Sequence, residues 1–360
     1  MDTTTNNLTI PDMLRDTYRK QLITVLQQKT SKYTPFVTWM SGASGKRVEF
    51  NTRGNTEVDF RVKRFEEKDP DELTFGKRAM IPVGFAKAMH WSEDDKILKG
   101  DFSVANQDFI EEMSYGFARK LDCLILGSWW DDSNKRYTVA TAGSNLNIKD
   151  SFYNGLGIGG ILGPAYVGEH LVTPENVSME AVTTDAKAYD GSNLKWEETT
   201  VIPYDYTESG TPEPTSMTKA KLLAAMRAME MRDALDDGGV LNVAITPAMK
   251  YELMNDPFFQ TKDHGYQVLK DGFFNSFLNI RFLVTRMVPQ VEISTPQGTK
   301  TVYACPVWRT EDVYAAWWDN LKYEIVKPSM SYDEIVISAK GALGCARRRL
   351  NTVLTIHCAG

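Results

Sequence analysis

Residues 242–289 constrain the fold of this 360-residue chain more than any other segment. Their pattern predicts a short strand over 242–245, a helix opened by Thr246 and Pro247, and a second strand over 280–288. A polar bend punctuated by glycine separates the helix from the second strand. This unit is a compact α/β core, yet it carries no residue pair of the kind that performs chemistry at strand ends. The segment therefore favours a structural protein.

The composition is that of an ordinary folded protein, with 42% hydrophobic and 24% charged residues. A chain of this length can bury one large core or two modest ones. Its net charge of −6 disfavours a tight, sequence-independent grip on nucleic acid phosphates. Residues 1–9 lack the basic and apolar regions of a secretion signal, so we expect the protein to stay where it is made.

The four cysteines match neither a C-x-x-C redox pair nor a zinc quartet. We expect them to be reduced and mostly buried: Cys123, Cys305, Cys345 and Cys358. The longest uncharged stretch, 151–168, is rich in glycine and interrupted by a proline. It does not fit a membrane span of about 20 helix-forming residues, so we expect a loop there and no membrane partner.

Residues 9–29 are predicted to form an amphipathic helix, with Thr9 as its cap and Pro11 in its first turn. Its apolar stripe consists of Leu14, Tyr18, Leu22, Val25 and Leu26. A stripe on a terminal helix needs a surface to lie on. That surface is either the chain's own core or a neighbouring subunit.

Residues 46–75 alternate between apolar and charged side chains, which predicts a long hairpin of two charged strands. The apolar positions are Val48, Phe50, Val58, Phe60 and Val62, and the charged ones are Arg53, Glu57, Asp59, Arg61 and Lys63. An isolated two-stranded ribbon is marginally stable in water. We therefore expect this ribbon to cross its own domain or to lie across another molecule.

The longest predicted helix spans 106–130, where one face stays apolar at helical spacing. Residues 131–214 read as a loop-rich insertion with short strands such as 137–140. Order resumes with a helix capped by Thr218 that is predicted to end at Gly238 and Gly239.

The C-terminal part is predicted to be mostly strand. We expect strands over 302–308, 321–326, 334–340 and 353–357, with a short helix over 311–318 between the first two.

One glycine motif suggests a cofactor site, but its context does not support it. Gly155, Gly157 and Gly160 match the letters of the dinucleotide fingerprint, which needs a strand before it and a helix after it. Polar residues precede the motif, and Pro164 interrupts the stretch where the helix would have to form. We therefore predict no bound cofactor.

The remaining polar groups have plain structural interpretations. His90, His170, His264 and His357 form no paired-ligand motif, and the adjacent aspartates at 94–95, 131–132 and 236–237 are typical of turns and caps. Cys358 comes directly after His357 along a predicted strand, so the two side chains cannot share a face. The triplet 347–349 of arginines is expected to pair with a partner surface or to stay solvated. We predict no catalytic and no metal-binding residue.

Three stretches, taken in order, resemble the tailed-bacteriophage major capsid proteins of the Hong Kong ninety-seven-type fold. The stretches are His90-Trp91-Ser92-Glu93-Asp94-Asp95, then Ala118-Arg119-Lys120-Leu121-Asp122, then 246–253 followed by Asp271-Gly272 and Phe282-Leu283-Val284. The resemblance covers most of the chain and lies in the order of features rather than in a catalytic signature. It implies an α+β fold with an N-terminal arm, an extended β-hairpin loop, a long spine helix, a peripheral domain and an axial domain.

Carried onto this chain, the resemblance implies five parts. They are the arm (1–45), the extended loop (46–90), the peripheral domain with its spine helix (91–130 and 301–360), a loop-rich insertion (131–215) and the axial domain (216–300). The insertion is long for a connection between spine and axial domain. Some relatives crosslink through a lysine of the extended loop, but no motif selects one among Lys46, Lys63 and Lys68, so we predict no crosslink.

The function implied is self-assembly, through pentamers and hexamers, into an icosahedral shell around phage DNA that is not read by sequence. The residues expected to contact neighbouring subunits are Leu14, Tyr18, Leu22, Arg61, Lys63, Arg64, Glu66 and Glu67. Further expected partners are scaffolding, portal and decoration proteins, with assembly in the host cytoplasm and a final place in the virion capsid. No cofactor is expected.

Three alternatives stay open at this point. An encapsulin-type bacterial compartment has the same fold and would package a cargo enzyme. A small-molecule α/β enzyme would bind a nucleotide as a monomer. A tail or connector protein would form rings or tubes instead of closed shells.

Overall fold

The structure, a computed structural model, describes residues 28–53, 75–92, 102–139, 160–162, 165–168, 178–180, 199–235, 239–256, 269–270, 273–274, 276–277, 279–295, 298–326, 334–348 and 353–359. The chain divides into two compact units. The first consists of residues 1–31, 84–121 and 319–342, and the second of 32–83, 122–318 and 343–360.

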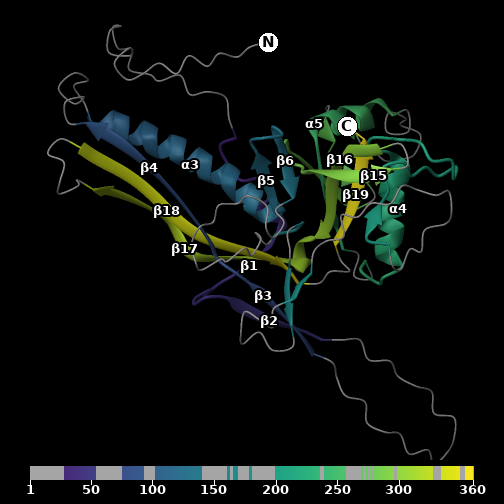
Figure 1. The fold of residues 1–360 in the computed structure, drawn as a ribbon, viewed down its shortest axis with the longest axis horizontal. Helices are drawn as coiled ribbons and strands as arrows, with labels where there is room; N and C mark the ends of the chain where they lie inside the picture. The colour runs from purple at the N-terminus through teal and green to yellow at the C-terminus, as the bar shows by residue number, and fades with distance from the viewer. Residues whose placement is uncertain are drawn as a thin grey trace, which may run out of the picture. The chain divides into compact units, whose positions relative to one another are not determined.

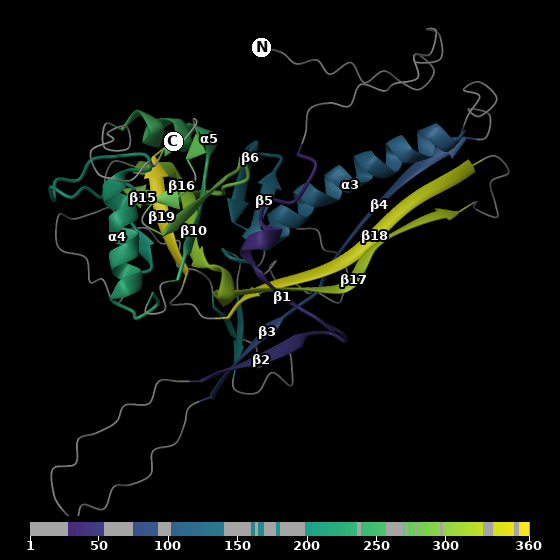
Figure 2. The same ribbon diagram turned by 180° about the vertical axis from the view of Figure 1, so that it is seen from behind.

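The first unit contains most of a long helix and most of the sheet that this helix covers on one face; the ends of both belong to the second unit. The helix is α3 (Phe102–Leu126), and the strands, in sheet order, are β17 (Val313–Val326), β18 (Glu334–Arg347) and β4 (Val83–Ser92). Figures 1 and 2 show α3 running alongside these strands. Met113 and Phe117 of the helix pack against Ile337 and Ala339 of β18. This layered packing is how a helix with one apolar stripe is stabilised.

The core of the second unit is a nine-stranded mixed sheet. Its main path runs β13 (Ser276–Phe277), β14 (Ile280–Val284), β10 (Leu241–Ile245), β16 (Gly298–Arg309), β15 (Gln290–Thr295), β6 (Arg136–Val139) and β5 (Ser128–Asp131). β19 (Val353–Ala359) pairs with β16, and β9 (Val201–Ile202) pairs with β19. Every residue of β10 is buried, as expected for a strand covered on both faces.

Shorter elements complete the described residues. They are η1 (Thr34–Phe36), β1 (Thr38–Met40), β2 (Val48–Arg53), β3 (Phe75–Met80), β7 (Ala165–Gly168), β8 (Ser178–Glu180), α4 (Lys219–Glu230), α5 (Pro247–Asn255), β11 (Leu269–Lys270), β12 (Phe273–Phe274) and η4 (Thr310–Asp312). α4 packs against β19 and β9 (Figure 1). β1 pairs in parallel with the start of β17, and β2, β3, β7 and β8 form a separate sheet.

The strand, helix and strand predicted over 242–288 are confirmed as β10, α5 and β14. The Thr246 hydroxyl accepts a hydrogen bond from the backbone N–H of Met249, which is the predicted cap. The second strand is shorter than predicted because the chain turns away after Val284, where the N–H of Thr285 still donates to Ile245.

Both long helices start close to the predicted residue but end earlier. α3 stops at Leu126 because Gly127 takes a φ of 76°, and the two tryptophans predicted in the helix, Trp129 and Trp130, lie in β5. α4 keeps its Thr218 cap but ends at Glu230 rather than at the glycine pair.

The helix predicted over 311–318 is wrong. A single 3-10 turn, η4, leads directly into the fourteen-residue strand β17. Val313, Ala315 and Ala316 are buried. Tertiary burial of aromatic and β-branched residues on a pleated surface outweighs the helical spacing in this stretch.

The first strand of the predicted hairpin is present as β2. β2 pairs antiparallel with β3, from Val48 opposite Met80 to Arg53 opposite Phe75. The predicted second strand over 58–62 lies outside the described residues. Met80 packs with Ala316 and Ala346 in the core of the second unit.

All four cysteines are free thiols in buried positions, as predicted. Among the described residues no helix is long and apolar enough to cross a membrane.

Candidate functional site

The eight residues predicted to contact neighbouring subunits cannot be placed. Leu14, Tyr18, Leu22, Arg61, Lys63, Arg64, Glu66 and Glu67 lie outside the described residues. The described residues instead show how the chain is held at residues 32–40, directly after the N-terminal segment.

A buried carboxylate holds the start of the second unit. Asp122, fully buried, accepts hydrogen bonds from the backbone N–H of Lys32 at 3.0 and 3.1 Å and from that of Tyr33 at 3.3 Å. The Lys32 ammonium donates to the carbonyl of Val284 at 2.8 Å. The Tyr33 ring is buried against Trp308, with centroids 6.0 Å apart. Burial, reinforced by the charge of Asp122, raises the pKa of Tyr33 well above its usual value.

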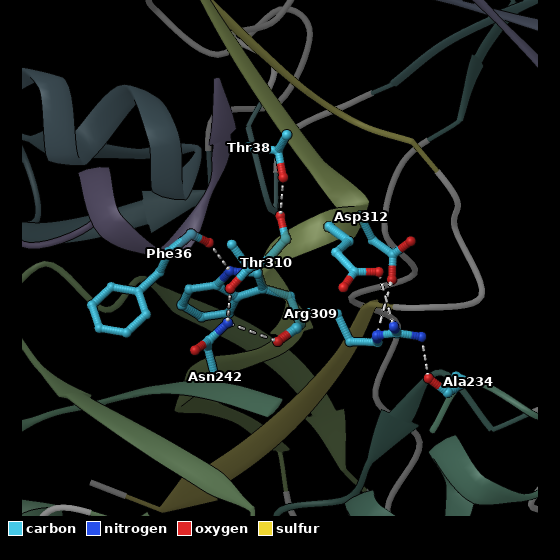
Figure 3. Close-up of polar contacts among 9 residues, drawn as sticks. Phe36, Thr38, Ala234, Asn242, Arg309, Thr310 and Asp312 are labelled. Atoms are coloured by element: carbon cyan, nitrogen blue, oxygen red, sulfur yellow. Dashed lines mark hydrogen bonds and ion pairs between the residues drawn. The ribbon is translucent and has the colours of Figure 1, made fainter. Parts of the chain in front are cut away.

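A second set of contacts, which we name the polar hub, surrounds the end of β16 (Figure 3). The Trp308 indole N–H donates to the Phe36 carbonyl at 3.0 Å, and the Thr38 hydroxyl donates to the Thr310 carbonyl at 2.9 Å. The Asn242 side-chain amide donates to the Thr310 hydroxyl at 3.0 Å and more weakly to the Trp308 carbonyl at 3.4 Å. The hub thus joins β10, β16 and the N-terminal segment.

Arg309 completes the hub on the side of α4. Its guanidinium donates to the Ala234 carbonyl, pairs with Glu311 at 3.0 Å and lies 4.0 Å from Asp312 (Figure 3). Gly239 covers the same guanidinium so closely that a Cβ there would lie 3.0 Å from Arg309 Nε. Glycine is therefore needed for packing after α4, although the helix itself ends earlier.

Together these contacts give the N-terminal segment a fixed root. Residues 32–40 are bound through side chains, through backbone groups and through the β1 and β17 pairing. The backbone at residues 32–40 is therefore held in a fixed position within the second unit.

A buried lysine of α4 binds the backbone of β19 in the nine-stranded sheet. The Lys221 ammonium donates to three backbone carbonyls, those of Tyr204 at 2.7 Å, Thr215 at 2.6 Å and His357 at 3.0 Å. Burial lowers its pKa. Every proton of the ammonium is thereby engaged in joining α4, a loop and β19, which is a structural role rather than a catalytic one.

Two titratable groups beside this lysine, His357 and Cys305, are held in their neutral forms at pH 7. Burial lowers the pKa of His357 to about 4, so the imidazole is neutral at pH 7. Burial raises the pKa of the Cys305 thiol and raises that of Cys345 to about 12. No group of three or more potential metal ligands occurs among the residues that the structure describes.

The glycine motif and the arginine triplet have structural roles where they are described. Gly160 lies against the end of α3, where a Cβ would come within 2.6 Å of the Leu124 carbonyl oxygen. The prediction for Arg347 is wrong, because its side chain is buried and donates to the carbonyl of Ile161 at 3.3 Å instead of facing solvent or a partner. Asp131 is a turn residue as predicted, accepting from the backbone N–H of Ser133 at 2.9 Å.

The sheet of the first unit has a charged face on the side away from α3. Lys322 pairs with Asp319 at 2.6 Å, and Lys340 pairs with Glu324 at 2.9 Å. All four side chains are exposed. Leu321 and Tyr323, which alternate with the charged residues along β17, pack instead against the cluster under α3.

The outer edge of β17 is only partly paired. β1 pairs with residues Tyr314 to Ala316, in parallel. Beyond Ala316, no strand in the described part of the chain pairs with this edge. An exposed strand edge presents free backbone donors and acceptors, so it is a surface on which another chain can pair.

Sequence reasoning missed Asp122 and Arg309, which hold the N-terminal root and the hub. A signal for Asp122 exists, since it stands between apolar residues of a helix face where a charge is out of place. Glu311 and Asp312 are sequence neighbours of Arg309, but its contacts with Ala234 and Gly239 are formed only by the fold.

One family of known proteins matches this chain in sequence. The model of the family described as phage capsid protein matches residues 175–360, just over half of the chain. No curated protein sequence matches the chain.

Solved capsid structures share the fold at low sequence identity. The capsid subunit of cyanophage Pam1 is 8% identical with a TM-score of 0.58, and the alignment covers 96% of each chain. The capsid of Ralstonia phage GP4 is 11% identical with a TM-score of 0.57, covering 96% of this chain and 95% of that one. A solved structure from Mycobacterium phage Ogopogo is 15% identical in sequence with a TM-score of 0.52, and the alignment covers 98% of this chain and 99% of that one.

The family match in sequence and the fold shared with solved capsid structures point the same way. The chain therefore belongs to the phage capsid protein family, as a major capsid protein that forms the shell of the virion.

Proposed function

We propose that the chain assembles through pentamers and hexamers into an icosahedral shell that encloses phage DNA without reading its sequence, and that it has no enzymatic activity. Closed symmetry lets many modest interfaces add up to a stable shell. The net charge of −6 supports enclosure rather than tight phosphate binding.

The observation that carries the proposal is the fixed root at residues 32–40. A segment that begins at a rigid point can be aimed at the same place on every neighbour. The sequence ahead of this root carries the apolar stripe of Leu14, Tyr18 and Leu22, and the sequence between β2 and β3 carries Arg61, Lys63, Arg64, Glu66 and Glu67. We assign both segments to contacts with adjacent subunits.

The parts of the chain are assigned on the same scheme. We assign 1–45 to an N-terminal arm, 46–90 to an extended loop, 91–130 and 301–360 to a peripheral domain, 131–215 to an insertion and 216–300 to an axial domain. Long α3, β17 and β18 support the peripheral assignment, and the compact β10, α5 and β14 unit supports the axial one. Scaffolding, portal and decoration proteins are the further partners, and assembly takes place in the host cytoplasm.

Negative-stain microscopy of the protein produced alone, and together with its neighbouring phage genes, tests the proposal. Closed icosahedral particles are the expected result, whereas rings or tubes would assign the chain to a connector or tail. Particles filled with a cargo enzyme rather than DNA would assign it to an encapsulin-type compartment. A monomer that persists at high concentration and binds a nucleotide would overturn the proposal.

A further inference from the structure

The edge of β17 beyond Ala316, with which no strand of the described residues pairs, carries a charge order that is complementary to itself. On the exposed face of the strand Lys322 precedes Glu324 by two positions, and Tyr323 lies between them on the face toward α3. When such a strand pairs antiparallel with an identical strand about Tyr323, each Lys322 lies opposite the Glu324 of the other copy. Opposite charges that face each other across strands stabilise pairing, and like charges destabilise it.

We propose that the edge of β17 pairs with the same edge of a second copy of this chain, in a two-fold antiparallel contact centred on Tyr323. Two identical surfaces meet in a two-fold contact of this kind. The inference rests on the proposed function, because a closed shell made of one chain contains two-fold contacts between its rings.

Faces and charges favour this register over its neighbours. A shift by one residue would turn the charged face of one copy to the side of the other copy's α3, so only registers that keep the faces together are compatible with one continuous sheet. Centring the axis on Lys322 or on Glu324 would place two identical charges directly opposite each other. Centring it on Tyr323 opposes Lys322 with Glu324 twice and brings the two tyrosine rings together on the inner face.

The ion pairs within one subunit do not compete with this contact. Lys322 pairs with Asp319 of its own strand, and Glu324 pairs with Lys340 of β18, at 2.6 and 2.9 Å. A second copy would place its Lys322 next to Glu324, so that Glu324 lies between that lysine and Lys340 of its own sheet. The contact therefore keeps the existing partners of each charge.

Charge reversal separates the contact between copies from the pairs within one copy. Lys322→Glu or Glu324→Lys alone opposes like charges twice at each contact and should reduce it about tenfold. The double variant Lys322→Glu/Glu324→Lys restores opposite charges across the axis, so the contact should recover. Within one subunit the double variant puts like charges beside both Asp319 and Lys340, so recovery cannot come from the intrachain pairs.

Disulfide trapping measures the contact directly in the full-length chain. Facing Cα atoms in an antiparallel pair lie about 4.5–5.5 Å apart, within the range of a disulfide. Assembled Tyr323→Cys subunits should form covalent dimers on mild oxidation, in the background of native cysteines that are all buried. Leu321→Cys is the matched control, because its two copies would be roughly 14 Å apart at about 3.4 Å per residue.

The variants combine into one experiment. The dimer fraction of Tyr323→Cys should fall about tenfold with Lys322→Glu and return with the double reversal, while Lys340→Glu, one strand further in, should leave it within about twofold. Failure of the double reversal to restore the dimer would overturn the inference.

Disulfides between Tyr323→Cys and Phe60→Cys subunits, with none between Tyr323→Cys subunits, would show that residues 46–75 of a neighbouring subunit occupy this edge instead. If unmodified chains form particles but Tyr323→Cys subunits do not crosslink within particles, the proposed contact is wrong and the proposed shell function is unaffected. If unmodified chains form no particles, the proposed function itself is wrong.

Discussion

At the residue scale, Asp122 holds the backbone at Lys32 and Tyr33, directly after the N-terminal segment. Its carboxylate accepts the backbone N–H groups of Lys32 and Tyr33 in a buried position. We expect Asp122→Ala to lower the free energy of unfolding by about 2–3 kcal/mol, because buried donors lose their acceptor. Urea unfolding of unassembled subunits measures the change. Asp131→Ala, which removes an exposed turn carboxylate, is the control, and an equal loss there would contradict this role for Asp122.

His357 gives the subunit a pH dependence. Neither ring nitrogen has a hydrogen-bond partner among the described residues, and burial lowers the pKa from 6.5 to about 4. Between these values the unfolded chain takes up a proton that the folded chain does not, so stability is complete above pH 6.5 and is lost as the pH falls toward 4. The total loss from this group is about 3 kcal/mol.

The variant His357→Leu tests this dependence. It should unfold at a similar or higher urea concentration at pH 7, because no hydrogen bond from the ring is broken. Its stability should fall less steeply than that of the unmodified chain between pH 6.5 and 4, by the equivalent of up to about one proton. Parallel curves for the two proteins would show that another group is responsible.

At the scale of elements, α3 is capped at its C-terminus by residues from a later part of the chain. The N–H groups of Ile161 and Leu162 donate to the carbonyls of Ile125 and Leu126 at 2.9 and 3.0 Å, and Gly160 donates to Cys345 at 2.9 Å. These bonds satisfy helix carbonyls that would otherwise lack partners. The close approach requires glycine at position 160, which has a φ of 113°.

Gly160→Ala should therefore destabilise the subunit by roughly 3 kcal/mol or more, because a methyl group would overlap backbone atoms that cannot move aside. Gly298→Ala is the matched control. Gly298 has a similar φ of 115° but no atom within 4 Å of the added Cβ, so only backbone strain of about 1–2 kcal/mol remains. Thermal unfolding monitored by circular dichroism compares the two, and equal losses would mean that contact with α3 is unimportant.

At the scale of the whole molecule, the arm should matter for closure and not for folding. Deleting residues 1–29 leaves the contacts of Lys32, Tyr33, Phe36 and Thr38 in place. We expect a soluble, folded subunit that fails to close shells. Circular dichroism and sedimentation check the fold, and electron microscopy checks assembly. Particles of normal shape from the deleted chain would refute the role of the arm.

The whole molecule also shows which features of the fold can be predicted from the sequence. Local signals predicted α3, the Thr218 and Thr246 caps and the strand, helix and strand unit, because capping and apolar periodicity are properties of neighbouring residues. The early end of α4, the strand in place of a helix at 313–318 and the burial of Arg347 depend on partners far apart in the chain. The polar hub is of the second kind, and no local pattern identifies it.

The fixed root of the N-terminal segment also has a consequence for timing during synthesis. The ribosome makes Phe36 and Thr38 early, but their partners Trp308 and Thr310 emerge only near the end of translation. A truncated polypeptide that stops before Trp308 keeps Asp122 but lacks Trp308, Thr310 and the strand β17 with which β1 pairs. Prematurely terminated products should therefore hold residues 36–40 less firmly than the complete chain does.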